Sequence, residues 1–134
     1  MKHASSIILT NKSRFLMHLR DDKPNISYPN YWSFIGGEIE KDESPLQAIE
    51  RECLEEIALK PSNIKFIGKL FIPSFNLNEN DEVFIFKGEV DKEVNEIVLT
   101  EGQRLEYFYF EDIQNLKIPA LVKKFILENK SKLF

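Results

Sequence analysis

Residues 32–61, WSFIGGEIEKDESPLQAIERECLEEIALKP, decide the fold because they predict one amphipathic helix with a definite beginning. Ser44 is the expected N-cap, and Pro45 takes the first helical position, where its missing N–H costs nothing. Gln47, three residues after Ser44, completes a capping-box pattern. Pro61 prevents the helix from running much further. Apolar residues at helical spacing predict one buried stripe, made of Leu46, Ile49, Cys53 and Ile57.

The opposite face of this helix is acidic. Glu52, Glu55 and Glu56 fall at positions i, i+3 and i+4, so their carboxylates crowd one another. They also lie in the C-terminal half of the helix, where the macrodipole disfavours each negative charge by roughly 0.3–1 kcal/mol. Arg51 offsets part of this repulsion by pairing with Glu55. A divalent cation that prefers oxygen ligands, Mg²⁺ or Mn²⁺, would relieve the rest, although a solvated acidic face is the usual alternative.

The wider spacing of these residues resembles a known signature. From Gly37 the chain reads Gly, five residues, Glu43, seven residues, and then RECLEEIAL at residues 51–59. This is similar to the Nudix box of the MutT-like pyrophosphohydrolases, Gly-x5-Glu-x7-Arg-Glu-U-x-Glu-Glu-x-Gly-U with U apolar. Every charged position matches, and so many specified positions at fixed spacing make a specific signal. The last glycine is replaced by Ala58. Because a left-handed helix terminus is costly for alanine, we expect the helix to end differently, at Lys60-Pro61.

The resemblance implies a Mg²⁺- or Mn²⁺-dependent hydrolase that cleaves the diphosphate linkage of a nucleoside diphosphate derivative, such as a nucleotide sugar or an NTP. The metal ligands that it implies are Glu52, Glu55, Glu56 and Glu101, with the carbonyl of Gly36. The catalytic residues that it implies are Arg51, Glu52, Glu55 and Glu101. Arg51 would orient the cluster through a salt bridge, with Glu43 as the expected partner. Glu52 and Glu101 both stay candidates for the base that takes the proton of the attacking water.

Glu101 enters this set through a second match. The triplet Glu101-Gly102-Gln103 precedes an expected strand at Leu105–Phe110. It resembles a triplet at the same place in MutT-like enzymes, where the glutamate supplies a further carboxylate to the metal cluster. Because this residue comes from a separate loop, the match is partly independent of the box.

Three residues are candidates for substrate binding. Arg20 ends an expected strand, and in relatives an arginine at that strand end often meets substrate phosphate. The alternative is a surface arginine paired with Asp21 or Asp22. Gly37 lets the backbone approach a ligand closely. Tyr31 is an aromatic residue just before the phosphate-binding loop, where it could stack on a base or simply pack.

Other residues bear on substrate choice. The connection at Ser74–Glu82 could contribute Phe75, Asn76 or Asn78, with a solvated loop as the alternative. Guanine-reading relatives place an asparagine just after a Pro-Ala pair like Pro119-Ala120, but Leu121 stands there. That difference argues against oxidised-guanine nucleotides. Trp32 and Phe34 are expected to pack, and His18 is expected to be a half-buried strand side chain.

The bulk properties exclude several classes. The chain of 134 residues suits one domain, residues 1–134, with a real core. The net charge of −4 argues against a nucleic-acid polymer or an acidic membrane as partner. One cysteine suits a reducing compartment, and Cys53 is expected in the core. With no bilayer-spanning run and no signal-peptide profile, a cytoplasmic location is the default. The oligomeric state stays open, with a homodimer as one alternative.

The order of elements predicts an α+β layered domain. Runs at Ser5–Leu9 and Arg14–Leu19 indicate a hairpin, Ile64–Pro73 and Val83–Val90 indicate two more strands, and Pro119–Asn129 indicates a closing helix. The resemblance implies the Nudix α/β/α sandwich with a mixed sheet. Two alternatives to a hydrolase remain, a non-catalytic Nudix-fold module that senses a nucleotide and an interaction domain with a merely solvated acidic helix. The intact glutamates argue against a pure sensor.

Overall fold

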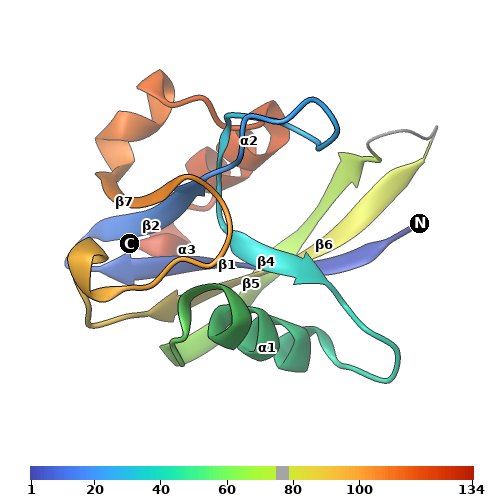
Figure 1. Ribbon diagram of the computed structural model, residues 1–134, viewed down its shortest axis with the longest axis horizontal. Coiled ribbons are helices and arrows are strands. Elements are labelled where there is room, and N and C mark those ends of the chain that lie inside the picture. Colours follow the sequence, from blue (N-terminus) through green and yellow to red (C-terminus); the bar gives the residue numbers. More distant parts are fainter. Residues whose placement is uncertain (75–78) are drawn as a thin grey trace.

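We analysed a computed structural model, which describes residues 1–74 and 79–134 (Figure 1). The predictions for Phe75, Asn76 and Asn78 therefore lie outside the described residues. None of the helices formed by the described ranges has the length and apolar character needed to span a bilayer.

The strands of the described residues form one seven-stranded sheet with the order β3-β2-β1-β6-β5, while β4 pairs with β1 and β7 pairs with β2. Their bounds are β1 His3–Asn11, β2 Arg14–Leu19, β3 Trp32–Ser33, β4 Ile35–Glu38, β5 Ser62–Pro73, β6 Asn80–Glu89 and β7 Arg104–Tyr109. The sheet is mixed because β1 and β6 run parallel, with Ser5 opposite Phe84, whereas the other pairs are antiparallel. The predicted mixed sheet is confirmed. The short strands β3 and β4 were not predicted from the sequence, and β4 carries the Gly36-Gly37 pair.

The hairpin of β1 and β2 forms where the sequence predicted it. Lys12 and Ser13, the two residues between the strands, have φ values of 51° and 67°. Positive φ at both positions is the requirement of the tight turn whose twist matches paired strands. The turn sets the register in which Leu9 faces Leu16.

Alternating residues of the central strands supply two cores, one on each face of the sheet. On one face Ile7, Leu9 and Leu16 join the apolar stripe of α1 (Pro45–Ile57). On the other face Ile8, Phe15 and Met17 join Ile126 of α2 (Ala120–Glu128). Figure 1 shows α1 and α2 on opposite sides of the sheet. This arrangement confirms the α+β class and the α/β/α sandwich.

Helix α1 begins as predicted. The Ser44 hydroxyl accepts a hydrogen bond from Gln47 N, and the Gln47 side chain accepts one from Ser44 N at 2.8 Å. Ile49, Cys53 and Ile57 are fully buried, but Leu46 is 44% exposed. The prediction for Leu46 was wrong. In the first turn it is Ala48, not Leu46, that faces the core, with no exposed surface.

The predicted end of α1 was also wrong. Ala58 adopts the left-handed conformation, with φ 54° and ψ 34°, and ends the helix there. Its N–H donates to the carbonyl of Leu54, and the N–H of Leu59 donates to the carbonyl of Cys53. These bonds satisfy two carbonyls that a helix end would otherwise leave unpaired. The tertiary fold thus imposes the glycine-type terminus on an alanine.

The C-terminal third contains the remaining helices and strand β7. Short 3-10 helices occupy Val94–Glu96 and Phe110–Asn115, and α3 (Lys130–Leu133) follows α2. Within α2, Ile126 is buried, whereas Leu121 is 39% exposed.

Candidate active site

The acidic face of α1 is organised by one guanidinium. Arg51 Nε donates to Glu43 at 2.8 Å, which confirms the predicted pairing. Arg51 Nη1 donates to Glu52 at 3.0 Å and to Glu55 at 3.2 Å, and Nη2 donates to the Glu38 carbonyl. The hydrogen bond from Arg51 holds the pKa of Glu43 below its usual value, and the same contact raises the pKa of Arg51. Arg51 therefore fixes the loop before α1 to the acidic face of the helix.

The two glycines of β4 serve close packing. A Cβ added to Gly37 would lie 2.3 Å from a carboxylate oxygen of Glu52, and one added to Gly36 would lie 2.3 Å from the Ser5 carbonyl oxygen. Both distances are impossible contacts. Residue 36 must therefore be glycine for β4 to lie against β1, and residue 37 must be glycine for Glu52 to lie against the backbone.

Glu56 is the buried acid of the site. Its residue is 8% exposed, and its carboxylate accepts a hydrogen bond from Gly36 N at 3.2 Å. Burial raises the pKa of Glu56 to about 8, and a hydrogen bond with the Glu52 carboxyl and the charges of Glu52 and Glu101 act in the same direction. Burial and these neighbouring carboxylates therefore favour the protonated form of Glu56 when no cation is bound.

The loop that carries Glu101 is attached to the end of α1. Thr100 N donates to the Glu56 carbonyl at 3.0 Å, and the Thr100 hydroxyl donates to the Glu55 carbonyl at 3.0 Å. This attachment brings Glu101 close enough for its charge to raise the pKa of Glu56.

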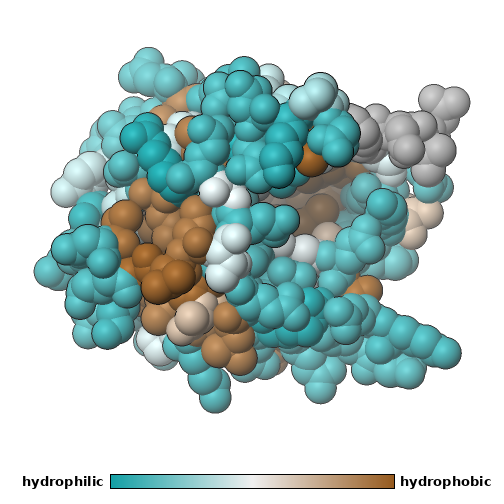
Figure 2. Space-filling model, in the orientation of Figure 1, coloured by the Kyte–Doolittle hydropathy of each residue, from teal (hydrophilic) through white to brown (hydrophobic). Residues whose placement is uncertain are grey.

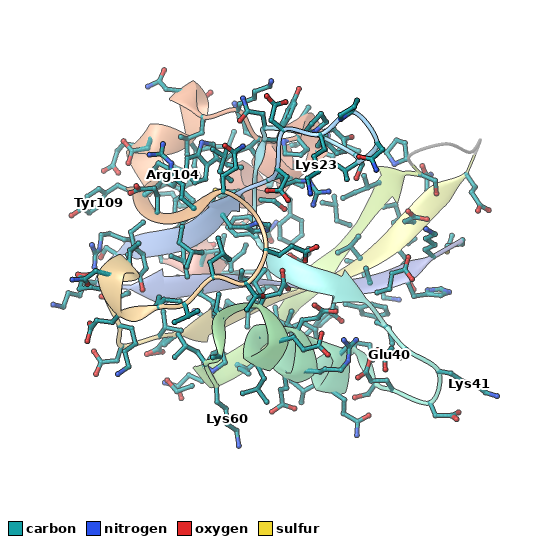
Figure 3. All side chains as sticks on the ribbon, in the orientation of Figure 1. Lys23, Glu40, Lys41, Lys60, Arg104 and Tyr109 are labelled. Carbon is teal, nitrogen blue, oxygen red and sulfur yellow. The ribbon has the colours of Figure 1, made fainter. Side chains whose placement is uncertain are left out.

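Glu56 and Glu101 line a cleft of about 460 Å³. Figure 2 shows it in the upper right of the view as a hollow with a hydrophobic floor and a hydrophilic rim. Its polar lining includes Gly36, Gly37, Arg20 and Lys23 together with the two glutamates, and its apolar lining includes Leu70, Ile72, Val83, Ile85, Pro119 and Val122. Figure 3 shows Lys41 and Lys60, in contrast, pointing outward away from this region. The cleft thus combines acidic and cationic side chains, suited to a metal-bound phosphate chain, with an apolar surface.

The structure brings only part of the predicted set together. Glu52 lies behind Gly37, outside the lining of the cleft, and Glu55 points outward with 57% of its side chain exposed. Tyr31 packs edge-on against Tyr28, with the Lys117 ammonium 4.6 Å from its ring centroid. It does not line the cleft, and its substrate role stays a prediction.

Arg20 lies at the cleft, and His18 is more deeply buried than the sequence predicted. Arg20 lines the cleft, and its Nε donates to the Ser27 carbonyl at 2.9 Å, whereas Asp21 pairs with Lys23. His18 is 7% exposed, so the expected half burial was wrong. Burial lowers the pKa of His18, and its Nδ1 lacks a hydrogen-bond partner among the described residues. Trp32 and Phe34 are buried as predicted.

Cys53 plays no part in this chemistry. The thiol is fully buried on the inner face of α1, and burial raises its pKa to about 12. Since the thiolate is the nucleophile, this side chain is inert. The predicted core position is confirmed.

The donor set fits a hard divalent cation. Within residues 1–74 and 79–134 no three His, Cys, Asp or Glu side chains already converge as a metal site. The oxygens that face one another are nevertheless carboxylates, the ligand type of Mg²⁺ and Mn²⁺. Glu56 in particular is a buried acid whose ionisation is opposed by Glu52 and Glu101. A cation between them would offset this repulsion.

The chain is similar to known proteins over most of its length. The family model described as the NUDIX domain matches residues 2–128. The RNA pyrophosphohydrolases of Hydrogenovibrio crunogenus and Thioalkalivibrio sulfidiphilus are 38% and 50% identical over 42 and 38 residues, which are 31% and 28% of this chain. These matches span only 26% and 22% of those relatives.

Solved structures extend the similarity to the whole fold. The MutT protein of Methanosarcina mazei Go1 superposes with a TM-score of 0.81 at 21% identity, over 98% of this chain and 94% of that one. The NUDIX domain of Shewanella oneidensis NrtR, solved in complex with ADP ribose, superposes with a TM-score of 0.74 at 14% identity, over 98% and 87%. At these identities the likeness is one of fold.

Proposed function

Because the chain belongs to the Nudix hydrolase family, whose domain model matches residues 2–128, we propose that it is a Mg²⁺-dependent pyrophosphohydrolase. Its proposed substrate is a nucleoside diphosphate derivative, such as a nucleotide sugar or an NTP, cleaved at the diphosphate linkage. The observation that carries this proposal is Glu56, an acid buried at the end of a cleft that Glu101 and the paired glycines also line. In the metal-free protein the charged form of Glu56 is unfavourable, because burial and Glu52 oppose its ionisation.

The proposed cation ligands are Glu52, Glu55, Glu56 and Glu101, with the Gly36 carbonyl. A Mg²⁺ or Mn²⁺ ion held by them would neutralise the phosphate charge, polarise a phosphoryl oxygen and acidify the attacking water. Arg51 already bonds to Glu52 and Glu55, so it holds two of these side chains on the rigid frame of α1. Glu55 is the more exposed of the two and would have to turn toward the cleft.

The reaction asks the chain for positioning and for removal of one proton. Water attacks one phosphorus atom, the bond from that phosphorus to the bridging oxygen breaks, and the leaving phosphate carries away the electron pair. Arg20, at the mouth of the cleft, would contact a phosphate of the substrate. Glu52 and Glu101 remain the two candidates for the general base, since both lie beside Glu56 and neither is as deeply buried.

The experiment is a substrate panel with product identification. The purified chain with Mg²⁺ is offered nucleotide sugars, NTPs, dinucleotides, ADP ribose and an RNA oligomer with a 5′-triphosphate. The last two are included because structural and curated relatives bind or are named for them. We expect release of a mononucleotide from a small-molecule member of the panel. Turnover of none of them would refute the hydrolase assignment.

Two variants test the metal ligands. Glu55→Gln and Glu56→Gln should abolish release, while Glu50→Gln, on the same helix but outside the Arg51 network, should leave it unchanged. Undiminished turnover in both ligand variants would refute the metal assignment. A titration of the melting temperature adds a readout without substrate. The proposal predicts a saturable rise with Mg²⁺ or Mn²⁺ in the wild type, whereas a solvated acidic face predicts none.

A nucleotide sensor is the alternative function. The NUDIX domain of NrtR was solved with ADP ribose bound, and binding of such a ligand without cleavage would fit the same cleft. Stabilisation by ADP ribose with no product in the panel would identify this alternative.

A further inference from the structure

Gln103 joins two loops that border the cleft from different parts of the chain. Its backbone N–H donates to the Leu19 carbonyl at 2.8 Å. Its side-chain Nε2 donates to the Arg20 carbonyl at 2.8 Å and to Asn30 Oδ1 at 3.0 Å. One residue therefore bonds to the strand end, to the first residue of the following loop and to a residue near the end of that loop.

The loop held in this way carries the cationic side of the cleft. Arg20 and Lys23 line the cleft, and the loop closes on itself through Arg20 N to Tyr31 O at 2.9 Å and Asn30 N to Asp21 O at 3.1 Å. Gln103 is thus the point at which the loop of Glu101 is attached to the loop of Arg20.

Gly102 lets these two loops meet. Its φ is +93°, and an added Cβ would lie 3.0 Å from both His18 Nδ1 and the Leu19 carbonyl oxygen. On the other side of Glu101, Thr100 bonds to the end of α1. Glu101 is therefore anchored on one side to the helix of the glutamates and on the other side to the loop of the arginine.

We propose that Gln103 is a positioning residue that fixes the carboxylate of Glu101 relative to the guanidinium of Arg20. The proposal rests on the proposed function, in which Glu101 serves the cation or the water and Arg20 serves the phosphate. A displacement of reacting groups by about 1 Å costs up to about a hundredfold in rate. Gln103 touches neither the substrate nor the cation and acts through the two residues that do.

The test variant is Gln103→Met, which keeps the length of the side chain and removes the Nε2 donor. Gln47→Met is the matched control, because Gln47 also loses a side-chain hydrogen bond, at Ser44 N, and lies outside the cleft. With the panel substrate that the wild type cleaves fastest, we expect kcat/KM to fall about tenfold in Gln103→Met and to stay within about twofold in the control.

A double-mutant cycle separates positioning from general damage. In an Arg20→Met background the further loss from Gln103→Met should shrink to less than about threefold, because the residue that it positions is already gone. A purely structural role would give the same tenfold factor in both backgrounds. Equal factors, or an unchanged kcat/KM in the single variant, would overturn the proposal.

Hydrogen exchange tests the attachment without substrate or metal. In metal-free protein, Gln103→Met should speed exchange at the amides of Arg20, Asn30 and Tyr31 by about threefold or more, whereas Gln47→Met should not. Unchanged exchange at these amides would show that the two loops do not depend on Gln103. A wild type that cleaves nothing would sink the proposed function, and the exchange result would still decide whether Gln103 joins the loops.

Discussion

Replacing the buried acid Glu56 by glutamine should make the metal-free protein more stable at pH 8 and less able to bind a cation. The amide keeps the shape of the side chain and an oxygen that can accept the hydrogen bond from Gly36 N, which the carboxylate accepts at 3.2 Å. Its amino group can donate to the neighbouring Glu52 carboxylate, which in the wild type opposes the ionisation of Glu56. The substitution therefore removes the charge and leaves the packing intact.

The pH dependence of this effect follows from the pKa of Glu56, raised from 4.5 to about 8 by burial first. Between these values the unfolded chain loses the proton and the folded chain retains it. The contribution of Glu56 to the free energy of unfolding therefore decreases as pH rises from about 5 to about 8. At 1.36 kcal/mol per unit the shift has a ceiling on the order of 5 kcal/mol, and part of it belongs to the pair with Glu52.

The assay is urea unfolding in EDTA at pH 5, 6.5 and 8, followed by the fluorescence of the single tryptophan. Wild type and Glu56→Gln should be nearly equal at pH 5, and the variant should be more stable by about 2 kcal/mol or more at pH 8. With saturating Mg²⁺ the wild type should regain stability at pH 8 and the variant should not. The lowered pKa values of His18 and Glu43 act in the opposite direction, but both side chains are present in the two proteins, so their effects cancel in the comparison. Parallel pH curves for the two proteins would refute the reasoning.

Three further predictions concern positions that the fold constrains. Ala58→Gly should raise the free energy of unfolding by about 0.5–1 kcal/mol in urea, since the left-handed strain of about 1–2 kcal/mol exceeds the entropic cost of glycine; a destabilised variant would contradict the helix terminus at φ 54°. Gly37→Ala should lower kcat/KM by about a hundredfold, because its Cβ would occupy a position 2.3 Å from Glu52 Oε1, and wild-type kinetics would disprove this close approach. Cys53, with a pKa raised to about 12, should react with a thiol reagent at pH 8 only after unfolding; rapid labelling of the native protein would show that the thiol is accessible.

Local rules predicted the beginning of α1 well. The cap at Ser44 and the proline at position 45 depend on a few adjacent residues, and nothing elsewhere in the fold overrides them. The end of the same helix could not be predicted from adjacent residues. A lone alanine disfavours the left-handed terminus, but the chain must turn into β5, and the bonds of residues 58 and 59 to the preceding carbonyls outweigh the local preference. Leu46 likewise has the right spacing for the core, and only the placement of α1 on the sheet shows that it faces outward.

In the site, too, some features could be predicted from the sequence, and others depend on the tertiary fold. The spacing of Glu52, Glu55 and Glu56 placed them on one helix face, and the salt bridge from Arg51 to Glu43 was expected from the resemblance to the Nudix box. The depth of Glu56 depends on β1 and β4 packing against the helix, which periodicity does not report. The bonds of Gln103 join residues more than 70 positions apart in the chain. The sequence signal for these bonds was the triplet Glu101-Gly102-Gln103, in which only Glu101 was predicted to have a role.

The position of β1 has a consequence for synthesis. This first strand pairs with β6 in parallel, with His3 opposite Glu82 and Thr10 opposite Glu89. A ribosome must therefore release almost ninety residues before the central strand finds its principal neighbour, and Glu101 follows later still. Contacts of such sequence separation form slowly. Until then β1 can pair only with β2 and β4, and its other edge stays open to other molecules, so shielding during translation should govern the yield of native protein.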